Sequence, residues 1–122
     1  MSDTFATDET HRLIASDKVE GTAVYNREGE KLGHVTNFMV DKQSGQAEYA
    51  VLQFGGLFGI GSDYYPIPWE MLTYDTEMGG YMVDLDKDQL NDAPRYGESE
   101  PDFDDEYGRS VYGYYGLNYP VI

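Results

Sequence analysis

Cysteine, the most versatile of the reactive residue types, is missing from this chain. The 122 residues include 23 Asp and Glu, two histidines and no cysteine. Disulfides, thiolate metal sites and cysteine nucleophiles are therefore excluded. Of the histidines, His11 lies in a polar leader and His34 follows Gly33 on a predicted strand, and no motif couples either to a serine nucleophile. We expect no catalytic residues, no metal site and no cofactor.

The many carboxylates could bind calcium, but their spacing does not fit a known loop. An EF-hand loop needs Gly at its sixth position and Glu at its twelfth. In the acidic run over residues 102–106, counting from Asp102 places Tyr107 at the sixth position. A solvent-exposed acidic face is the more common explanation of such a run. Pairs of carboxylates for glycoside hydrolysis could be chosen from any chain this acidic, so the number alone carries no information.

A glycine-rich segment, residues 55–61, invites comparison with phosphate-binding loops. A Walker A loop needs Gly-Lys-Ser/Thr, whereas here Gly61 is followed directly by Ser62. A dinucleotide-binding loop must open a helix, and residues 63–66 are predicted to be extended. We expect a wide turn whose apolar side chains either cover an end of the domain or form an exposed contact patch. These side chains are Leu57, Phe58 and Ile60.

Aromatic residues are abundant, with 12 tyrosines among the 122 residues. Tyrosine suits half-buried strands and protein interfaces. Trp69, after Pro66-Ile67-Pro68, is expected to close the core, and would be the leading hot spot for a partner if it were exposed. Tyrosines near the C-terminus belong either to a disordered tail or to a segment that packs on the domain or on a second copy. The candidate interaction surface comprises Leu57, Phe58, Ile60, Trp69, Tyr112, Tyr114, Tyr115 and Tyr119.

The net charge of −15 narrows the range of partners. Such a field repels phosphate backbones, so nucleic-acid binding is not expected. It also disfavours docking on anionic membranes. The N-terminal residues lack the basic and apolar regions of a signal peptide, and no apolar run approaches the ~18–20 residues that span a bilayer. We therefore expect a cytoplasmic protein without membrane insertion.

Most of these candidate residues are predicted to lie on short strands or in the segments beside them. The pattern predicts one helical turn over residues 86–90 and strands over residues 19–25, 32–41, 46–54, 63–69 and 81–85. A shift in the phase of the apolar residues indicates a bulge near Thr36-Asn37. Pro66 and Pro68 confine their stretch to a sheet edge or a strand end. The fold class is mostly β: a small antiparallel barrel, whose closure would remove exposed edges.

The chain divides into three segments: a polar leader at residues 1–14, the folded domain at 15–94, and an extended, acidic, Tyr- and Gly-rich extension at 95–122. The middle segment resembles the PRC-barrel domain, and especially its stand-alone bacterial members. The resemblance is carried by Gly-x-x-Val-Tyr-Asn leading to residues 29–35, the turn at 41–45, the loop at 55–61, and residues 66–75 running through Gly79-Gly80 to Leu90 and Ala93-Pro94.

That family includes the cytoplasmic part of the photosynthetic reaction-centre H subunit and the C-terminal domain of a ribosome-maturation factor. The resemblance implies a non-catalytic assembly module, often a dimer, and supplies no catalytic residues. We therefore expect no enzyme activity, a homodimer with a further protein partner, and, by fold analogy alone, a link to a photosynthetic or other membrane complex.

Two other classes of function stay open. A small-ligand carrier or enzyme would use the barrel interior, although barrels of this size are normally filled by side chains. A cation-responsive, stress-related acidic protein would let ions screen its self-repulsion. A ribosome- or RNA-related factor is disfavoured by the charge.

Overall fold

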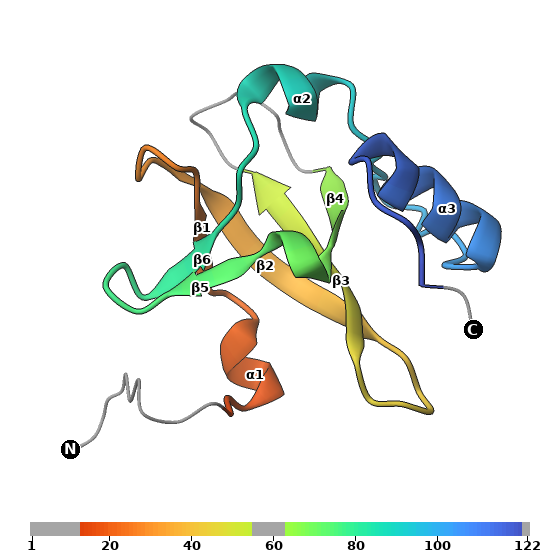
Figure 1. Ribbon diagram of the computed structural model, residues 1–122, viewed down its shortest axis with the longest axis horizontal. Helices are drawn as coiled ribbons and strands as arrows, with labels where there is room; N and C mark the ends of the chain where they lie inside the picture. The colour runs from red at the N-terminus through yellow and green to blue at the C-terminus, as the bar shows by residue number, and fades with distance from the viewer. Residues whose placement is uncertain (1–12, 55–62, 121–122) are drawn as a thin grey trace.

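The fold is described from a computed structural model, which describes residues 13–54 and 63–120. One six-stranded sheet dominates it, in the order β4-β3-β2-β1-β6-β5 (Figure 1). The mostly-β, PRC-barrel-like fold predicted from the sequence is confirmed. The strands are β1 (Ala23–Tyr25), β2 (Lys31–Val40), β3 (Ala47–Phe54), β4 (Tyr64–Pro68), β5 (Thr73–Asp75) and β6 (Gly80–Met82).

Closure of the barrel is less complete than the sequence predicts. Within residues 13–54 and 63–120, no ladder joins β4 to β5, the two ends of the sheet. The chain passes between them through a 3-10 turn, η2 (Trp69–Met71), and Trp69 packs against the core there. One ladder, β1 with β6, is parallel, whereas the four other described ladders are antiparallel. The expectation of a wholly antiparallel closed barrel is corrected accordingly.

The centre of the sheet agrees with the predicted register. The β2–β3 ladder shifts between Val35 and Asn37, which confirms the bulge expected at Thr36-Asn37. Gly33 is required here, because a Cβ atom at this position would lie 2.1 Å from the carbonyl oxygen of Gln53. Close approach of two backbones is a common reason for glycine within a strand. At the edge, β4 contains Pro66 and Pro68, as their missing N–H groups predict.

Several elements differ from the expected bounds. The strand expected over residues 19–25 is reduced to β1, because Ser16–Val19 form a short helix, α1, that buries Val19 in the core. The strand expected over 81–85 ends at Met82, although the backbone N–H of Val83 still donates to Tyr25 O at 2.9 Å. β5 was not expected at all. It forms because the chain doubles back through a tight turn to pair with β6.

The main core lies on one face of the sheet, the inner face. Its larger side chains come from all the long strands and from the segment after β6, and they include Val24, Leu32, Val35, Leu52, Phe54, Tyr65, Ile67, Val83, Leu85 and Leu90. Alternation of side chains along each strand sends every second residue to this face. Burial of this apolar surface, worth about 25 cal/mol per Å² removed from water, is the main source of stability.

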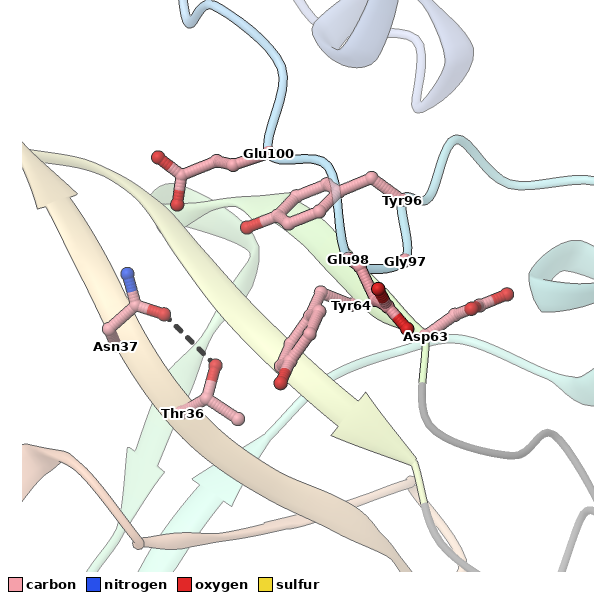
Figure 2. A pocket seen from close by; sticks show the side chains of 8 residues that line it. All are labelled: Thr36, Asn37, Asp63, Tyr64, Tyr96, Gly97, Glu98 and Glu100. Atoms are coloured by element: carbon pink, nitrogen blue, oxygen red, sulfur yellow. Dashed lines mark hydrogen bonds between the residues drawn. The ribbon is translucent and has the colours of Figure 1, made fainter.

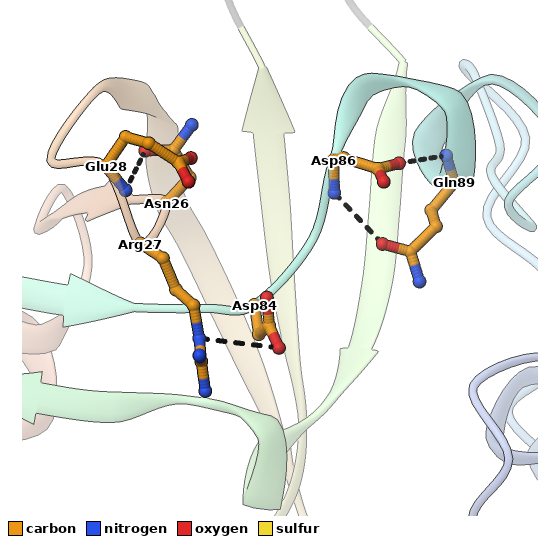
Figure 3. Close-up of polar contacts among 6 residues, drawn as sticks. All are labelled: Asn26, Arg27, Glu28, Asp84, Asp86 and Gln89. Carbon is orange, nitrogen blue, oxygen red and sulfur yellow. Dashed lines mark hydrogen bonds and ion pairs between the residues drawn. The ribbon is translucent and has the colours of Figure 1, made fainter.

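The predicted helical turn after the last strand is confirmed as α2 (Lys87–Asn91). A capping box begins it: Asp86 Oδ1 accepts from the Gln89 N–H at 2.8 Å, and Gln89 Oε1 accepts from the Asp86 N–H at 3.0 Å (Figure 3). Such reciprocal bonds satisfy donors that a helix start leaves free. Nearby, Arg27 Nε lies 3.4 Å from Asp84 Oδ2, which ties the β1–β2 turn to the chain that leads into α2.

The tyrosine-rich extension is neither extended nor disordered over its central part. Residues Asp105–Tyr114 form α3. Asp104 is its N-cap, and the Asp104 side chain accepts from the Tyr107 N–H at 2.9 Å. The helix lies beside β3 and β4 (Figure 1). Its apolar side, Val111 and Tyr112, packs on Tyr49 and forms a second core cluster on the outer face of the sheet. The tail therefore packs on its own domain.

Candidate functional site

A polar groove of about 860 Å³ lies on the part of the outer sheet face beside the segment that follows α2 (Figure 2). It is formed by the β2 bulge, the start of β4 and the chain at residues 96–100. The lining residues are Thr36, Asn37, Asp63, Tyr64, Tyr96, Gly97, Glu98 and Glu100. Carboxylates, tyrosines and one amide thus dominate a site open to solvent.

The bulge in β2 supplies one side of the groove. An extra residue in one strand re-aims its side chains, and here Thr36 and Asn37 both reach the groove. Thr36 Oγ1 lies 2.9 Å from the carbonyl oxygen of Val51 and 3.0 Å from Asn37 Oδ1, and its proton can serve only one of them at a time. Neither acceptor is a strong base, so the hydroxyl is held in place but is not activated as a nucleophile.

Two tyrosines form the opposite side. The backbones of Tyr64 and Tyr96 are joined by two hydrogen bonds, of 2.8 and 3.0 Å, that act as a one-residue extension of the sheet. Their rings are stacked, with centroids 5.5 Å apart and planes inclined by 30°. Burial, with a smaller contribution from the charge of Glu100, raises the pKa of Tyr96 to about 12. The Tyr96 phenol is therefore neutral near pH 7.

Three carboxylates surround this aromatic pair. Asp63 is already engaged, since its Oδ2 lies 3.4 Å from Arg95 Nε. Glu98 and Glu100 are exposed, and neither forms an ion pair with any described residue. Among the residues that the structure describes, no group of three His, Asp or Glu side chains could hold a metal ion. The rim thus carries unpaired negative charge spread over a wide opening.

The residues that the sequence suggested as an interaction surface do not form one exposed patch among the described residues. Leu57, Phe58 and Ile60 lie outside the described residues. Trp69 is partly buried, with ring centroids 5.8 Å from Phe38 and 5.7 Å from Tyr81. It therefore has the core-closing role expected for it, and is no exposed hot spot.

The four C-terminal tyrosines mostly hold α3 in place. Tyr112 is buried, and its hydroxyl donates to Glu48 O at 2.5 Å, while that of Tyr119 donates to Glu48 Oε1 at 3.2 Å. The Tyr115 hydroxyl is buried too. Tyr114 is more exposed, although its hydroxyl donates to the backbone oxygen of Gln89. These contacts are intramolecular, and the tyrosine contact surface expected from the sequence stays a prediction.

The outer edge of β5 pairs with no other described strand, and this free edge is a surface that the sequence did not indicate. Tyr74, at its centre, is 45% exposed and rests edge-on against Tyr81, with ring centroids 5.3 Å apart. Met78, in the following turn, is 36% exposed. The only sequence signals were the strand-forming Tyr74 and the Gly79-Gly80 turn, too brief to reveal a strand of three residues.

Residues 11–90 match the PRC-barrel domain, which is about two thirds of the chain, and the chain belongs to this family. It is also similar to an uncharacterized protein of Deinococcus radiodurans, with 29% identity over 76 residues. The aligned region is 62% of this chain but only 27% of that protein, so the chain spans less than a third of its relative. In the described part of the chain, no helix has the length and apolar character needed to cross a membrane.

Proposed function

We propose that this chain is a non-catalytic protein-interaction module that self-associates through the free edge of β5. The observation that carries the proposal is the contrast between the two edges of the sheet. At the β4 edge, Pro66 and Pro68 lack N–H groups and Tyr64 is already bridged to Tyr96. At the β5 edge, the described residues provide no such cover.

An uncovered strand edge is a template for pairing with another chain. The β5 edge is also preorganised, because Asp75 Oδ1 accepts from the N–H groups of Glu77 at 2.9 Å and Met78 at 3.1 Å and so fixes the turn. A partner strand would thus meet a rigid hairpin and lose little conformational entropy on that side.

The geometry of β5 suits pairing with its own copy. A two-fold antiparallel pair centred on Tyr74 places Tyr74 opposite Tyr74 of the second copy and Thr73 opposite Asp75. Aromatic side chains then meet across the interface, and the carboxylates do not face each other directly. Because the strand is short and each copy carries a net charge of −15, we expect a weak, micromolar dimer.

The test is sedimentation velocity of the full chain over a range of micromolar concentrations. Tyr74→Lys places a charge on the edge, a change that natural sheets use to prevent pairing. Val40→Lys is the matched control, because Val40 is 44% exposed on another strand and the charge change is the same. We expect the unmodified chain and the control to dimerise and Tyr74→Lys to stay monomeric. A strictly monomeric unmodified chain, or equal dimerisation of both variants, would disprove the proposal.

The absence of catalysis is part of the proposal. It is supported by Thr36, the hydroxyl in the groove, which contacts an amide and a carbonyl in place of a base. We also propose a cytoplasmic location and, by analogy with the H subunit alone, attachment to a membrane complex. Fractionation of cells that produce the full chain tests both: recovery with membranes that is lost on solubilising the complex is expected, and recovery wholly free of membranes would contradict the attachment.

A further inference from the structure

We infer that the groove between the β2 bulge and the stacked tyrosines binds an arginine-containing segment of a partner protein. The inference goes beyond self-association and involves other residues, since the groove and the β5 edge lie at opposite ends of the strand order. Three features carry it: the shape of the groove, the partly exposed aromatic pair, and the unpaired carboxylates beside that pair.

The charge of the groove selects a cation. Asp63, Glu98 and Glu100 contribute three carboxylates, and the described lining residues include no basic one. Of these three, only Asp63 has a cationic neighbour among the described residues, Arg95. An anionic ligand would meet both this rim and the overall charge of −15.

The size of the groove selects a large, planar cation over a metal ion. A bare ion needs several oxygens converging at about 2–2.6 Å, and the described carboxylates form no such group. At about 860 Å³ and open to solvent, the groove has room for a side chain together with flanking backbone. A guanidinium group stacks on aromatic faces and can donate to a carboxylate at the same time.

The chain itself contains this arrangement next to the groove. The Cζ atom of Arg95 lies over the ring of Tyr65, 5.8 Å from its centroid, while Arg95 Nε lies 3.4 Å from Asp63 Oδ2. Arginine, tyrosine and carboxylate are therefore already combined on one side of Asp63. On the other side, Tyr64 and Tyr96 with Glu98 and Glu100 repeat the aromatic and acidic parts and lack the arginine.

The amide and hydroxyl of the β2 bulge complete the site. Asn37 and Thr36 lie on the β2 side of the groove (Figure 2). An extended peptide laid along the groove would place its backbone against these polar groups and its arginine against the tyrosines. Such a division, with one charged anchor and polar contacts to the backbone, is common in peptide recognition.

The experiment measures fluorescence anisotropy of a labelled Gly-Arg-Gly-Arg-Gly peptide against the full chain at about 0.15 M NaCl, where the Debye length is about 8 Å. The groove variant is Glu98→Gln with Glu100→Gln. The control is Glu28→Gln with Glu77→Gln, two exposed carboxylates in turns remote from the groove that change the net charge equally. We expect the groove variant to bind at least about threefold more weakly than the control, and Tyr96→Leu to weaken binding by about two- to fivefold.

Two further arms identify the ligand. A peptide with citrulline in place of arginine keeps the shape but not the charge, and it should not bind. Arginine amide alone should bind much more weakly than the peptide. The inference would be overturned if the groove and control variants weakened binding equally. It would also be overturned if the citrulline peptide or arginine amide bound as tightly as the arginine peptide. Tyr74→Lys should leave peptide binding intact, so failure of self-association and failure of the groove are distinguishable.

Discussion

Tyr112 and Tyr115 are three residues apart at the end of α3, yet their hydroxyl groups are in opposite situations. The Tyr112 hydroxyl donates to Glu48 O at 2.5 Å. The Tyr115 hydroxyl is buried and has no hydrogen-bond partner among the described residues. A bonded buried hydroxyl stabilises a fold, whereas an unbonded one costs its desolvation.

Replacing each of these tyrosines with phenylalanine should therefore give different results. We expect Tyr112→Phe to lower the free energy of unfolding by about 1 kcal/mol, because the bond to Glu48 is lost. Tyr115→Phe should be neutral or stabilising, since only an unsatisfied group is removed. Urea denaturation of both variants makes the comparison. A larger loss for Tyr115→Phe would contradict the described environments.

The buried phenols also predict how stability depends on pH. Burial raises the pKa of both Tyr96 and Tyr112 to about 12, whereas unfolded tyrosine titrates near 10. Between pH 10 and 12 the unfolded chain loses protons that the folded chain retains, so stability falls as pH rises. Below pH 10 these groups are protonated in both states and contribute no dependence.

Thermal unfolding across this range should show a falling melting temperature above pH 10, with a shallower slope for Tyr112→Phe. Tyrosinate absorbance should show a late-titrating fraction while the chain stays folded. A melting temperature that does not change to pH 11.5, between the normal and raised values, would contradict the burial of these groups.

For individual residues, the sequence indicated the right residue types but not their roles. The abundance of tyrosine near the C-terminus indicated packing or contact, and the structure assigns most of these side chains to packing. Their direction depends on how α3 docks, which one sequence does not reveal. The groove shows the same limit, because Tyr64 and Tyr96 are distant in sequence and are brought together by a backbone bridge and ring stacking.

Among the elements, α3 contains two glycines in different surroundings, Gly108 and Gly113. A Cβ atom at Gly108 would lie 2.3 Å from the ring of Tyr119, so this glycine forms the socket for that side chain. A Cβ atom at Gly113 would meet nothing within 4 Å. In a helix interior, alanine is otherwise more favourable than glycine by roughly 0.5–1 kcal/mol.

Substitution by alanine should accordingly have opposite effects at the two positions. We expect Gly108→Ala to destabilise the chain by about 1–3 kcal/mol through overpacking, and Gly113→Ala to stabilise it by roughly 0.5–1 kcal/mol. The measurement is chemical denaturation. In a Tyr119→Ala background, Gly108→Ala should no longer destabilise. If both alanines act alike in the unmodified chain, Tyr119 is not seated on Gly108.

Strong local signals made some elements predictable. Two prolines identified the β4 edge, a phase shift identified the bulge, and Asp86 with Gln89 fits the start of α2. The parallel pairing of β1 with β6 and the short β5 depend on contacts between distant parts of the chain. Helix α3 was missed because two glycines lower its helix propensity, although Asp104 is a suitable N-cap.

For the whole molecule, the net charge of −15 opposes compactness. Like charges destabilise a folded chain through self-repulsion, and salt screens them. We expect the melting temperature to rise as NaCl is added. Because the described residues contain no group that could hold a metal ion, calcium at matched ionic strength should act no more strongly than sodium. No response to salt, or a disproportionate response to calcium, would contradict this.

The same repulsion opposes association of two copies, so screening should also strengthen the proposed dimer. The central claim is that the β5 edge pairs with a second copy. Hydrogen–deuterium exchange at low and high micromolar concentrations tests it most directly. We predict that added protection at high concentration is confined to β5, over Thr73–Asp75, and disappears in Tyr74→Lys. Exchange that does not depend on concentration, or protection that appears elsewhere and leaves β5 unchanged, would contradict the account.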